Sequence, residues 1–296
     1  MTAILAMMSV LGVGSILILQ GSAGPASATD MQIQAAHGAS FVPALEGKRP
    51  LFILALGSDA RPGQPINRER ADSIHLIGIN LRTHRATILG FPRDSWVNIP
   101  GFGMAKINTA MTSGGPQLMV RTIESLTHIR IDFWLLTSFT GLTSMVNRIG
   151  GLTVRVPLPM HDRFSGANFS AGKHHFNGQQ ALSFARDRHD VPGGDLGRSA
   201  NQGRLLLAAL FKLRSGFRER PATVLTWIGV GWRHISTDLD VGTLLDLGLT
   251  ATQVRKVNNL VVPATTGSVG AQSVVFISPS AASVYADMRA DGVART

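Results

Sequence analysis

The chain contains no cysteine, and this absence removes several classes of function at once. Without thiols there are no disulfides, no thiolate metal sites and no cysteine-based catalysis. Other signatures are missing too: there is no GxxxxGK[ST] phosphate loop, no GxGxxG, no GxSxG and no HExxH. Their absence argues against nucleotide-driven kinases, dinucleotide enzymes, esterases and zinc proteases.

Lysine is scarce, with five positions among the 28 basic residues. The formal net charge of +10 is therefore carried mainly by arginine. A guanidinium group presents a planar fork of donors that matches phosphate oxygens, so this excess favours a phosphate-bearing ligand. Nucleic acid, anionic lipid and phosphorylated metabolites all fit such a charge.

Basic residues are absent before Lys48, and residues 3–19 carry no charge at all. This apolar run is slightly shorter than the roughly 20 residues that usually span a bilayer. The small-residue sequence ASA at 26–28 resembles a cleavage site, although a basic n-region is missing. Residues 1–20 are therefore predicted to be either a signal-anchor helix or a cleaved signal peptide. We expect a single-pass cell-membrane protein with an extracytoplasmic domain, or a secreted one if the segment is removed.

Residues 21–47 are small and polar and are predicted to be an extracytoplasmic linker, followed by one domain over residues 48–296. Apolar runs between turn signals predict strands at 51–57, 73–81, 85–91, 132–138 and 152–158. Helices are predicted at 116–126, 140–149 and 196–212, and a last strand and helix within 273–292. This alternation favours a three-layer α/β/α sandwich around a mixed β-sheet.

Four arginines lie beside an apolar helix between Ser183 and Leu213. If residues 184–188 are extended, Arg186 and Arg188 point the same way. Asp195 is predicted to cap the following helix, on which Arg198 and the residue four positions later share one face. Cationic side chains that converge at a helix N-terminus favour an anionic ligand.

Further charged residues gather where the predicted strands begin or end. They are Asp59, Arg61, Arg70, Asp72, Arg93 and Asp94. Ligands of α/β sheets bind at strand ends, so these loops are predicted to line one cleft, although any single Arg–Asp pair also fits a surface salt bridge. Asp59 and Asp72 are candidate ligands for Mg²⁺, or for Mn²⁺ in the same role, because close carboxylates repel unless a cation intervenes. Such a site suits phosphoryl transfer. The histidines at 174, 175 and 189 lack the spacing of a metal site.

Taken in order, these motifs resemble the LytR-CpsA-Psr family of cell-wall glycopolymer ligases. The segments that carry the resemblance are LGSDAR, RADSIHLIGIN, GFPRDSWVNIPGFGMAKINTA, GGLTV, FNGQQALSFARDR and GGDLGRSANQ. The resemblance implies an α/β/α domain outside the membrane, an apolar groove for a polyprenyl chain, and arginines with Mg²⁺ around its pyrophosphate. It further implies transfer of a glycan from that lipid to peptidoglycan.

The motifs and the resemblance together assign roles to individual residues. Asp59 and Asp72 are assigned to the metal. Catalytic contacts are assigned to Arg93, Arg186 and Arg188, and substrate binding to Arg61, Arg70, Lys106, Arg198 and Gln202. Residues 205–210 and 133–142 are candidates for the lipid-tail groove, with ordinary core packing as the alternative. Asn201 departs from the family, which commonly has a basic residue there, so one phosphate contact is expected to be lost.

The expected partners are a polyprenyl-pyrophosphate-linked glycan, a peptidoglycan acceptor and the membrane, with no nucleic acid. A carrier that binds polyprenyl phosphates without transfer is an alternative, as is a pyrophosphatase in which water replaces the acceptor. A basic nucleic-acid-binding regulator is a third reading. The apolar N-terminus and the lack of a DNA-reading motif argue against it.

Overall fold

The computed structural model describes Leu45 and residues 47–295. The predicted membrane segment and nearly all of the predicted linker lie outside these residues. Among the helices that are described, none combines the length and the apolar character needed to cross a membrane.

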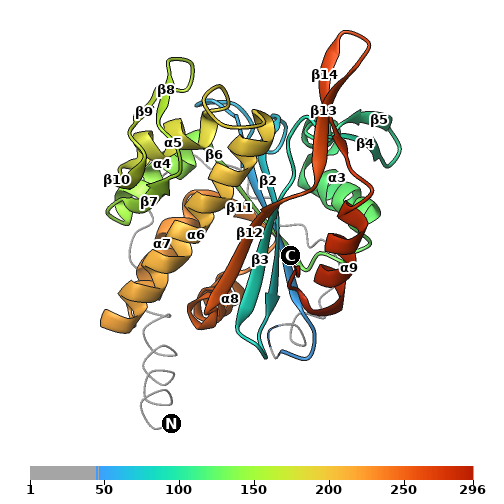
Figure 1. Cartoon of the computed structure of the whole chain (residues 1–296). Coiled ribbons are helices and arrows are strands. Elements are labelled where there is room, and N and C mark those ends of the chain that lie inside the picture. The colour runs from blue at the N-terminus through green and yellow to red at the C-terminus, as the bar shows by residue number, and fades with distance from the viewer. Residues whose placement is uncertain (1–44, 46, 296) are drawn as a thin grey trace. The chain divides into compact units, whose positions relative to one another are not determined.

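A six-stranded mixed sheet forms the centre of the described region (Figure 1), in the order β11-β6-β1-β2-β3-β12. Its strands are β1 (Leu51–Ser58), β2 (Ala71–Asn80), β3 (Arg85–Gly90), β6 (Phe133–Ser138), β11 (Ile235–Thr237) and β12 (Lys256–Val261). β1 pairs with β6 and β3 with β12 in parallel, and the other neighbours are antiparallel. The predicted mixed α/β architecture is thus confirmed.

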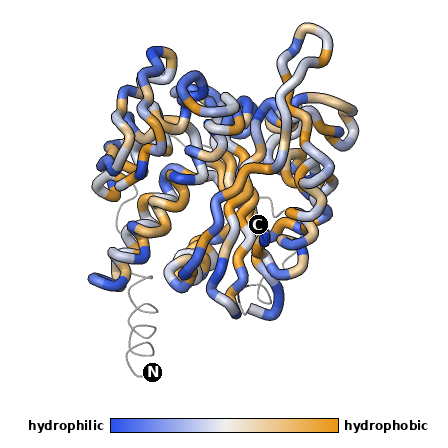
Figure 2. Tube along the Cα trace, in the orientation of Figure 1, coloured by the Kyte–Doolittle hydropathy of each residue, from blue (hydrophilic) through white to orange (hydrophobic). Residues whose placement is uncertain are grey.

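Helices cover both faces of this sheet (Figure 1). α3 (Thr109–Thr127) and α9 (Ala281–Asp291) pack on one face. The helices of the other side are α4 (Phe139–Arg148), α5 (Gly178–Arg186), α6 (Asp195–Glu219), α7 (Thr223–Trp232) and α8 (Val241–Gln253). Side chains alternate along a strand, so Leu54 and Leu56 of β1 join the core under α3 while Leu51 and Ile53 join the core under α8. Figure 2 shows the hydrophobic residues concentrated along these central strands.

Within the described residues, four two-stranded sheets lie outside the central one. They pair β4 (Trp96–Ile99) with β5 (Gly103–Lys106), β7 (Leu152–Val156) with β10 (Gly172–Phe176), β8 (Met160–Asp162) with β9 (Ala167–Phe169), and β13 (Ala264–Val269) with β14 (Gln272–Ile277). The strand predicted at 152–158 therefore exists but does not belong to the central sheet. Its alternating burial explains this, because a strand with one buried face does not need helices on both sides.

Two local predictions were wrong and one was incomplete. α3 begins at Thr109, but non-helical backbone at Gly114 and Gly115 divides it, and the part after this kink begins at Pro116 as predicted. Asp195 is the first residue of α6 and Gly194 is its N-cap. Residues 184–186 are not extended but form the last turn of α5, and Asp187 follows as an extended C-cap.

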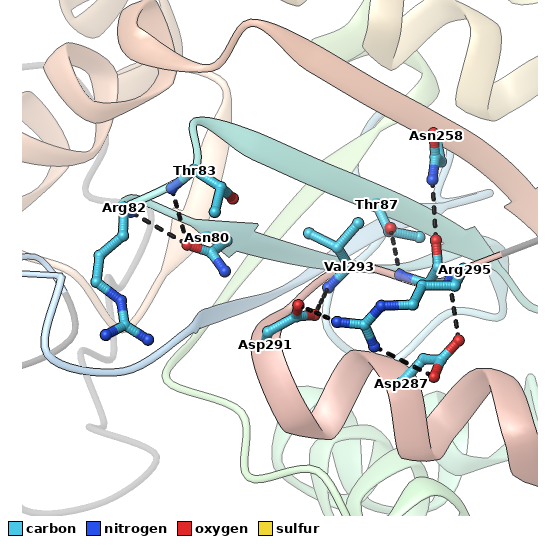
Figure 3. A network of polar contacts seen from close by, with 10 residues as sticks. Asn80, Arg82, Thr83, Thr87, Asn258, Asp287, Asp291, Val293 and Arg295 are labelled. Atoms are coloured by element: carbon cyan, nitrogen blue, oxygen red, sulfur yellow. Dashed lines mark hydrogen bonds and ion pairs between the residues drawn. The ribbon is translucent and has the colours of Figure 1, made fainter.

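The C-terminal residues are anchored to the sheet by a polar network (Figure 3). Asn258 Nδ2 donates to the Ala294 carbonyl oxygen at 2.9 Å, and the Ala294 amide donates to Thr87 Oγ1 at 2.9 Å. Arg295 forms ion pairs with two carboxylates of α9, Asp287 and Asp291. The network fixes α9 against β3 and β12, far along the chain from the loops considered next.

Candidate functional site

The strand directions bring several loops to one edge of the sheet. Ser58 at the end of β1 is paired with Ala71 at the start of β2 and with Ser138 at the end of β6. His75 near the start of β2 is opposite Gly90, the last residue of β3. The segments after β1, before β2, after β3 and after β6 therefore leave the sheet at the same edge, as the sequence predicted for the first three.

A cavity of about 640 Å³ opens at this edge, and α6 runs along it. Arg198, Gln202, Leu205, Leu206 and Ala209 all line it. Their spacing of three or four residues places them on one face of the helix. Eleven residues of helix span about 16 Å, so the cavity wall changes from polar to apolar over that distance.

Apolar side chains from four other elements complete the far part of the cavity. They come from β6, α4 and its C-cap, α7 and β11, and include Leu135, Phe139, Leu142, Met145, Val146, Ile149, Trp227, Val230 and Ile235. Protein interiors are normally close-packed, so an apolar cavity of this size indicates a ligand with a large apolar part. The prediction that residues 133–142 and 205–210 contribute to a groove is consistent with this lining. Sequence reasoning did not find the contribution of α7.

Six residues predicted for the site line the polar part of the same cavity: Asp72, Arg93, Arg186, Arg188, Arg198 and Gln202. Arg93 Nη1 contacts Asp72 Oδ1 at 2.6 Å. Arg198 Nη2 contacts Asp195 Oδ1 at 2.7 Å, and Arg93 Nε lies 4.0 Å from the same oxygen. Asp195, which the sequence suggested only as a helix cap, is thus the carboxylate between two arginines.

The polar part of the cavity carries closely spaced positive charges, which favour binding of an anion. Arg198 is 5% exposed. Its burial lowers the pKa of Arg198, and the charge of Arg93 lowers it further despite the opposing effect of Asp195. Arg93 Nε is buried and has no hydrogen-bond partner among the described residues. An anionic oxygen at this position would satisfy that donor and relieve the repulsion between the two guanidinium groups.

Arg186 and Arg188 reach the cavity from the end of α5. A capping box at Asn177 and Gln180 fixes the start of that helix, and Arg186 lies in its last turn. The Arg186 guanidinium carbon lies 5.3 Å from the centre of the Phe139 ring. Neither arginine forms an ion pair with any carboxylate in the described part of the chain. The predicted extended segment was wrong, but both side chains line the cavity and Asp187 is buried.

Two polar side chains hold α6 in place against β2. Gln202 Nε2 donates to the Asp72 carbonyl oxygen at 3.0 Å and to the Ala185 carbonyl oxygen at 3.2 Å. The buried His75 ring contacts Ser199 O through Nε2 and Ser73 Oγ through Nδ1, each at 3.1 Å. A carbonyl accepts, so Nε2 carries the proton and Nδ1 accepts from the serine hydroxyl. Burial lowers the pKa of His75 to about 4.

The two predicted metal ligands lie close enough for the charge of Asp72 to act on Asp59, and of the two only Asp72 lines the cavity. Burial raises the pKa of Asp59, and the charges of Asp72 and Glu69 raise it further, against the opposing effect of Arg70 and Arg93. Asp72 Oδ1 is engaged by Arg93, which leaves its second oxygen for another partner. A pair of mutually repelling carboxylates fits a divalent cation with oxygen ligands.

The remaining predicted residues lie around the cavity and do not line it. Arg61 is exposed in the loop between β1 and β2. Arg70 is exposed near Asp59. Lys106 Nζ forms an ion pair with Asp94 at 3.1 Å, and the charge of that carboxylate acts on both Arg93 and Arg198.

The chain is similar to known proteins in both sequence and fold. The profile of the LytR_cpsA_psr family matches residues 19–289. The Probable cell wall biosynthesis protein LcpB of Corynebacterium glutamicum is 37% identical over 169 residues, which cover 53% of this chain and 40% of that protein. The Polyisoprenyl-teichoic acid--peptidoglycan teichoic acid transferase TagU of Oceanobacillus iheyensis is 34% identical over 207 residues, or 68% of this chain and 62% of that protein. The matched region thus spans less than two thirds of these relatives.

Solved structures share the fold at low sequence identity. TagT bound to LI-WTA superposes with a TM-score of 0.71 at 23% identity, over 90% of this chain and 100% of that one. The family protein YwtF (TagT) with bound octaprenyl pyrophosphate lipid superposes with a TM-score of 0.67 at 22% identity, over the same shares. Protein gbs0355 from Streptococcus agalactiae gives 0.72 at 23% identity, over 82% of this chain and 88% of that protein.

Proposed function

The chain belongs to the LytR_cpsA_psr family, and from this premise we propose that it transfers a glycopolymer from a polyprenyl-pyrophosphate carrier to peptidoglycan. One observation carries the proposal: a single cavity joins an arginine cluster to a long apolar section. A ligand that fills both parts must itself have a highly charged head and an apolar tail. The TagU relatives are named polyisoprenyl-teichoic acid–peptidoglycan teichoic acid transferases, which supports the same chemistry.

The pyrophosphate head is placed among the arginines. Arg93 and Arg198 lie on opposite sides of Asp195 and have limited exposure, so they form the fixed part of the binding site. Arg186 and Arg188 are exposed and without carboxylate partners among the described residues, so their charge is available to the ligand. The prenyl chain then follows α6 between α4 and α7.

In the proposed reaction a hydroxyl oxygen of a peptidoglycan sugar attacks the phosphorus nearest the glycan. A new oxygen–phosphorus bond forms, the bond from this phosphorus to the oxygen bridging to the lipid phosphate breaks, and polyprenyl phosphate leaves with that oxygen. The hydroxyl proton passes to a base, for which Asp72 and Asp94 are the candidates. Negative charge grows on the equatorial oxygens and on the leaving phosphate, and positioned guanidinium groups stabilise it more than they stabilise the ground state.

Asp59 and Asp72 are proposed to hold Mg²⁺, or Mn²⁺ in the same role. When bound, such a cation neutralises phosphate charge and helps orient the reacting phosphoryl group. The chain itself supports this position: Arg93 holds one Asp72 oxygen, and burial together with the charges of Asp72 and Glu69 raises the pKa of Asp59.

We further propose that residues 1–20 anchor the protein and that the domain lies outside the cytoplasm, where peptidoglycan is found. The absence of cysteine provides a clean test. An Ala271→Cys variant carries one thiol at the exposed β13–β14 turn. Labelling of intact cells by a membrane-impermeant maleimide is expected, whereas labelling only after lysis would contradict this topology.

The function is tested with the full-length chain in detergent, Mg²⁺, a lipid-linked glycan that carries the label, and uncrosslinked peptidoglycan. Arg188→Ala is expected to lower the transfer rate about 10²-fold, the usual cost of one charge-stabilising donor. Arg121→Ala, an exposed arginine of α3 on the opposite face of the sheet, is the matched control and is expected to retain full activity.

Each outcome separates the candidate functions. Label that moves to peptidoglycan with wild type and with Arg121→Ala, but not with Arg188→Ala, supports the transferase. Label that remains on bound lipid supports a carrier, and label released to water supports a pyrophosphatase. Equal rates for wild type and Arg188→Ala would refute the assigned role of this arginine.

A further inference from the structure

We infer that Asp162, Asp187 and His189 form a second divalent-cation site, of different chemistry from the carboxylate pair described above. Each of the three residues offers one ligand atom, and these atoms all lie within 4.8 Å of one another. They come from the end of β8, the C-cap of α5 and the loop that follows. None of the three was predicted as a ligand from the sequence.

The first observation concerns Asp187, which is fully buried. Its Oδ1 accepts hydrogen bonds from the backbone amides of His189 at 3.0 Å and Asp190 at 3.3 Å. Its Oδ2 is buried and has no hydrogen-bond partner among the described residues. Leaving a buried carboxylate oxygen unpaired is costly, and a bound cation removes that cost.

The charges around Asp187 also favour a bound cation. Burial raises the pKa of Asp187, and the nearby carboxylates Asp190 and Asp162 raise it further, although its two backbone hydrogen bonds act in the opposite direction. No Arg or Lys forms an ion pair with Asp187 in the described region. The position has surplus negative charge in a buried setting, which favours a metal cation.

Backbone hydrogen bonds hold the carboxylate of Asp162 in position. Its oxygens accept from the backbone amides of Phe164 at 2.9 Å and Ser165 at 3.2 Å, and His189 Nδ1 lies 3.1 Å from Oδ1. These two amides therefore fix the Asp162 carboxylate beside the His189 ring.

His189 provides both selectivity and access. Its ring packs against Phe164, with centroids 4.9 Å apart, and its side chain is 45% exposed. An imidazole beside two carboxylates favours first-row transition ions such as Zn²⁺ and Mn²⁺ over Mg²⁺. Ligand atoms around such ions lie within about 4 Å of one another, so a small movement of the exposed ring closes the site.

The proposed cation site borders the cavity, but binding of the cation does not require glycan transfer. Asp162 and His189 line the cavity beside Arg188. Three protein ligands leave coordination positions open, which water or an oxygen of the cavity ligand can fill. The site therefore adds positive charge at the head end of the cavity.

Zn²⁺ titration of the chelator-treated, full-length protein in detergent tests the inference by calorimetry. Asp187→Asn and His189→Ala are each expected to weaken this binding at least about tenfold, since outer-shell partners of metal ligands alone contribute roughly 10- to 100-fold. Asp246→Asn is the matched control, because it removes the same charge from an exposed position of α8 without removing a ligand. Asp246→Asn and Asp59→Asn are expected to retain the site. Equal binding in all five proteins, or no binding, would overturn the inference.

A spectroscopic measurement keeps the test valid if Asp187→Asn disturbs folding. Pulsed EPR of bound Mn²⁺ is expected to show ¹⁴N coupling from the imidazole in wild type and in Asp59→Asn. The coupling is expected to disappear in His189→Ala, whose changed side chain is largely exposed and whose fold is checked by circular dichroism. Mn²⁺ without nitrogen coupling, or coupling that persists in His189→Ala, would contradict the site.

Discussion

Acidification is expected to lower the unfolding free energy through His75, whose buried ring connects β2 to α6. The ring bonds Ser199, which lies between Arg198 and Gln202 on the helix that lines the cavity. Burial holds the pKa of His75 at about 4, whereas an unfolded chain has the ordinary value of 6.5. As the pH falls below 6.5, the unfolded chain takes up a proton that the folded chain excludes. Stability is therefore lost between pH 6.5 and about 4, with no further loss from this group below that range.

The size of the effect follows from the two pKa values. A pKa difference of about 2.5, at about 1.4 kcal/mol for each pH unit, corresponds to about 3 kcal/mol of unfolding free energy, most of it lost by pH 4.5. Carboxylates of the protein titrate in an overlapping pH range, so the experiment needs a variant that lacks only the His75 imidazole. His75→Gln keeps an amide donor for the Ser199 carbonyl but has no group that titrates in this range.

Urea unfolding of wild type and His75→Gln at pH 7 and at pH 4.5 provides the measurement. We expect wild type to lose about 2–3 kcal/mol more than the variant between these two pH values. The variant is expected to be less stable than wild type at pH 7, because the buried ring is lost. If both proteins lose the same free energy on acidification, His75 is not excluded from protonation and the reasoning is refuted.

Three further substitutions test the packing of the site. Arg198→Met leaves Asp195 with only the more distant Arg93 as an ion-pair partner and is expected to cost about 1–3 kcal/mol in urea unfolding; a loss below about 0.5 kcal/mol would show that the pair is not structurally important. Ala209→Trp fills the apolar section and is expected to abolish measurable binding of a fluorescent polyprenyl phosphate, while Phe211→Trp, on an exposed part of the same helix, retains it; equal binding would place the tail elsewhere. Gly178→Ala would place a Cβ 2.1 Å from the carbonyl oxygen of Thr143, so a fall in melting temperature is expected, and an unchanged value would show that the α4–α5 contact yields easily.

The sequence was most informative where a pattern repeats along one element. The apolar runs of β1, β2 and β3 predicted their positions closely, because a strand covered on both faces must be apolar throughout. The spacing of Arg198 and Gln202 correctly placed both on the cavity face of α6. These features depend on local geometry, so they can be predicted from the sequence without knowledge of the fold.

Features that depend on distant partners were missed. Aspartate is a common helix N-cap, which is why Asp195 was predicted as one. It is instead the first residue of α6, and Arg93, which approaches it, lies about a hundred residues earlier in the chain. Asp162 and His189 likewise meet only after β8 and the α5–α6 loop have folded together, so no spacing could reveal them. Tertiary contacts therefore determined what local preference could not.

The central claim is that one cavity holds a charged head and an apolar tail together. Its most direct test compares the affinity of the full-length protein for polyprenyl pyrophosphate, for the uncharged polyprenol of the same length, and for inorganic pyrophosphate. The account predicts that the complete lipid binds much more tightly than either fragment, that Arg93→Ala weakens only the ligands with phosphate, and that Ala209→Trp weakens only those with a tail. Polyprenol that binds as tightly as its pyrophosphate, or fragments that do not compete with the complete lipid, would contradict it.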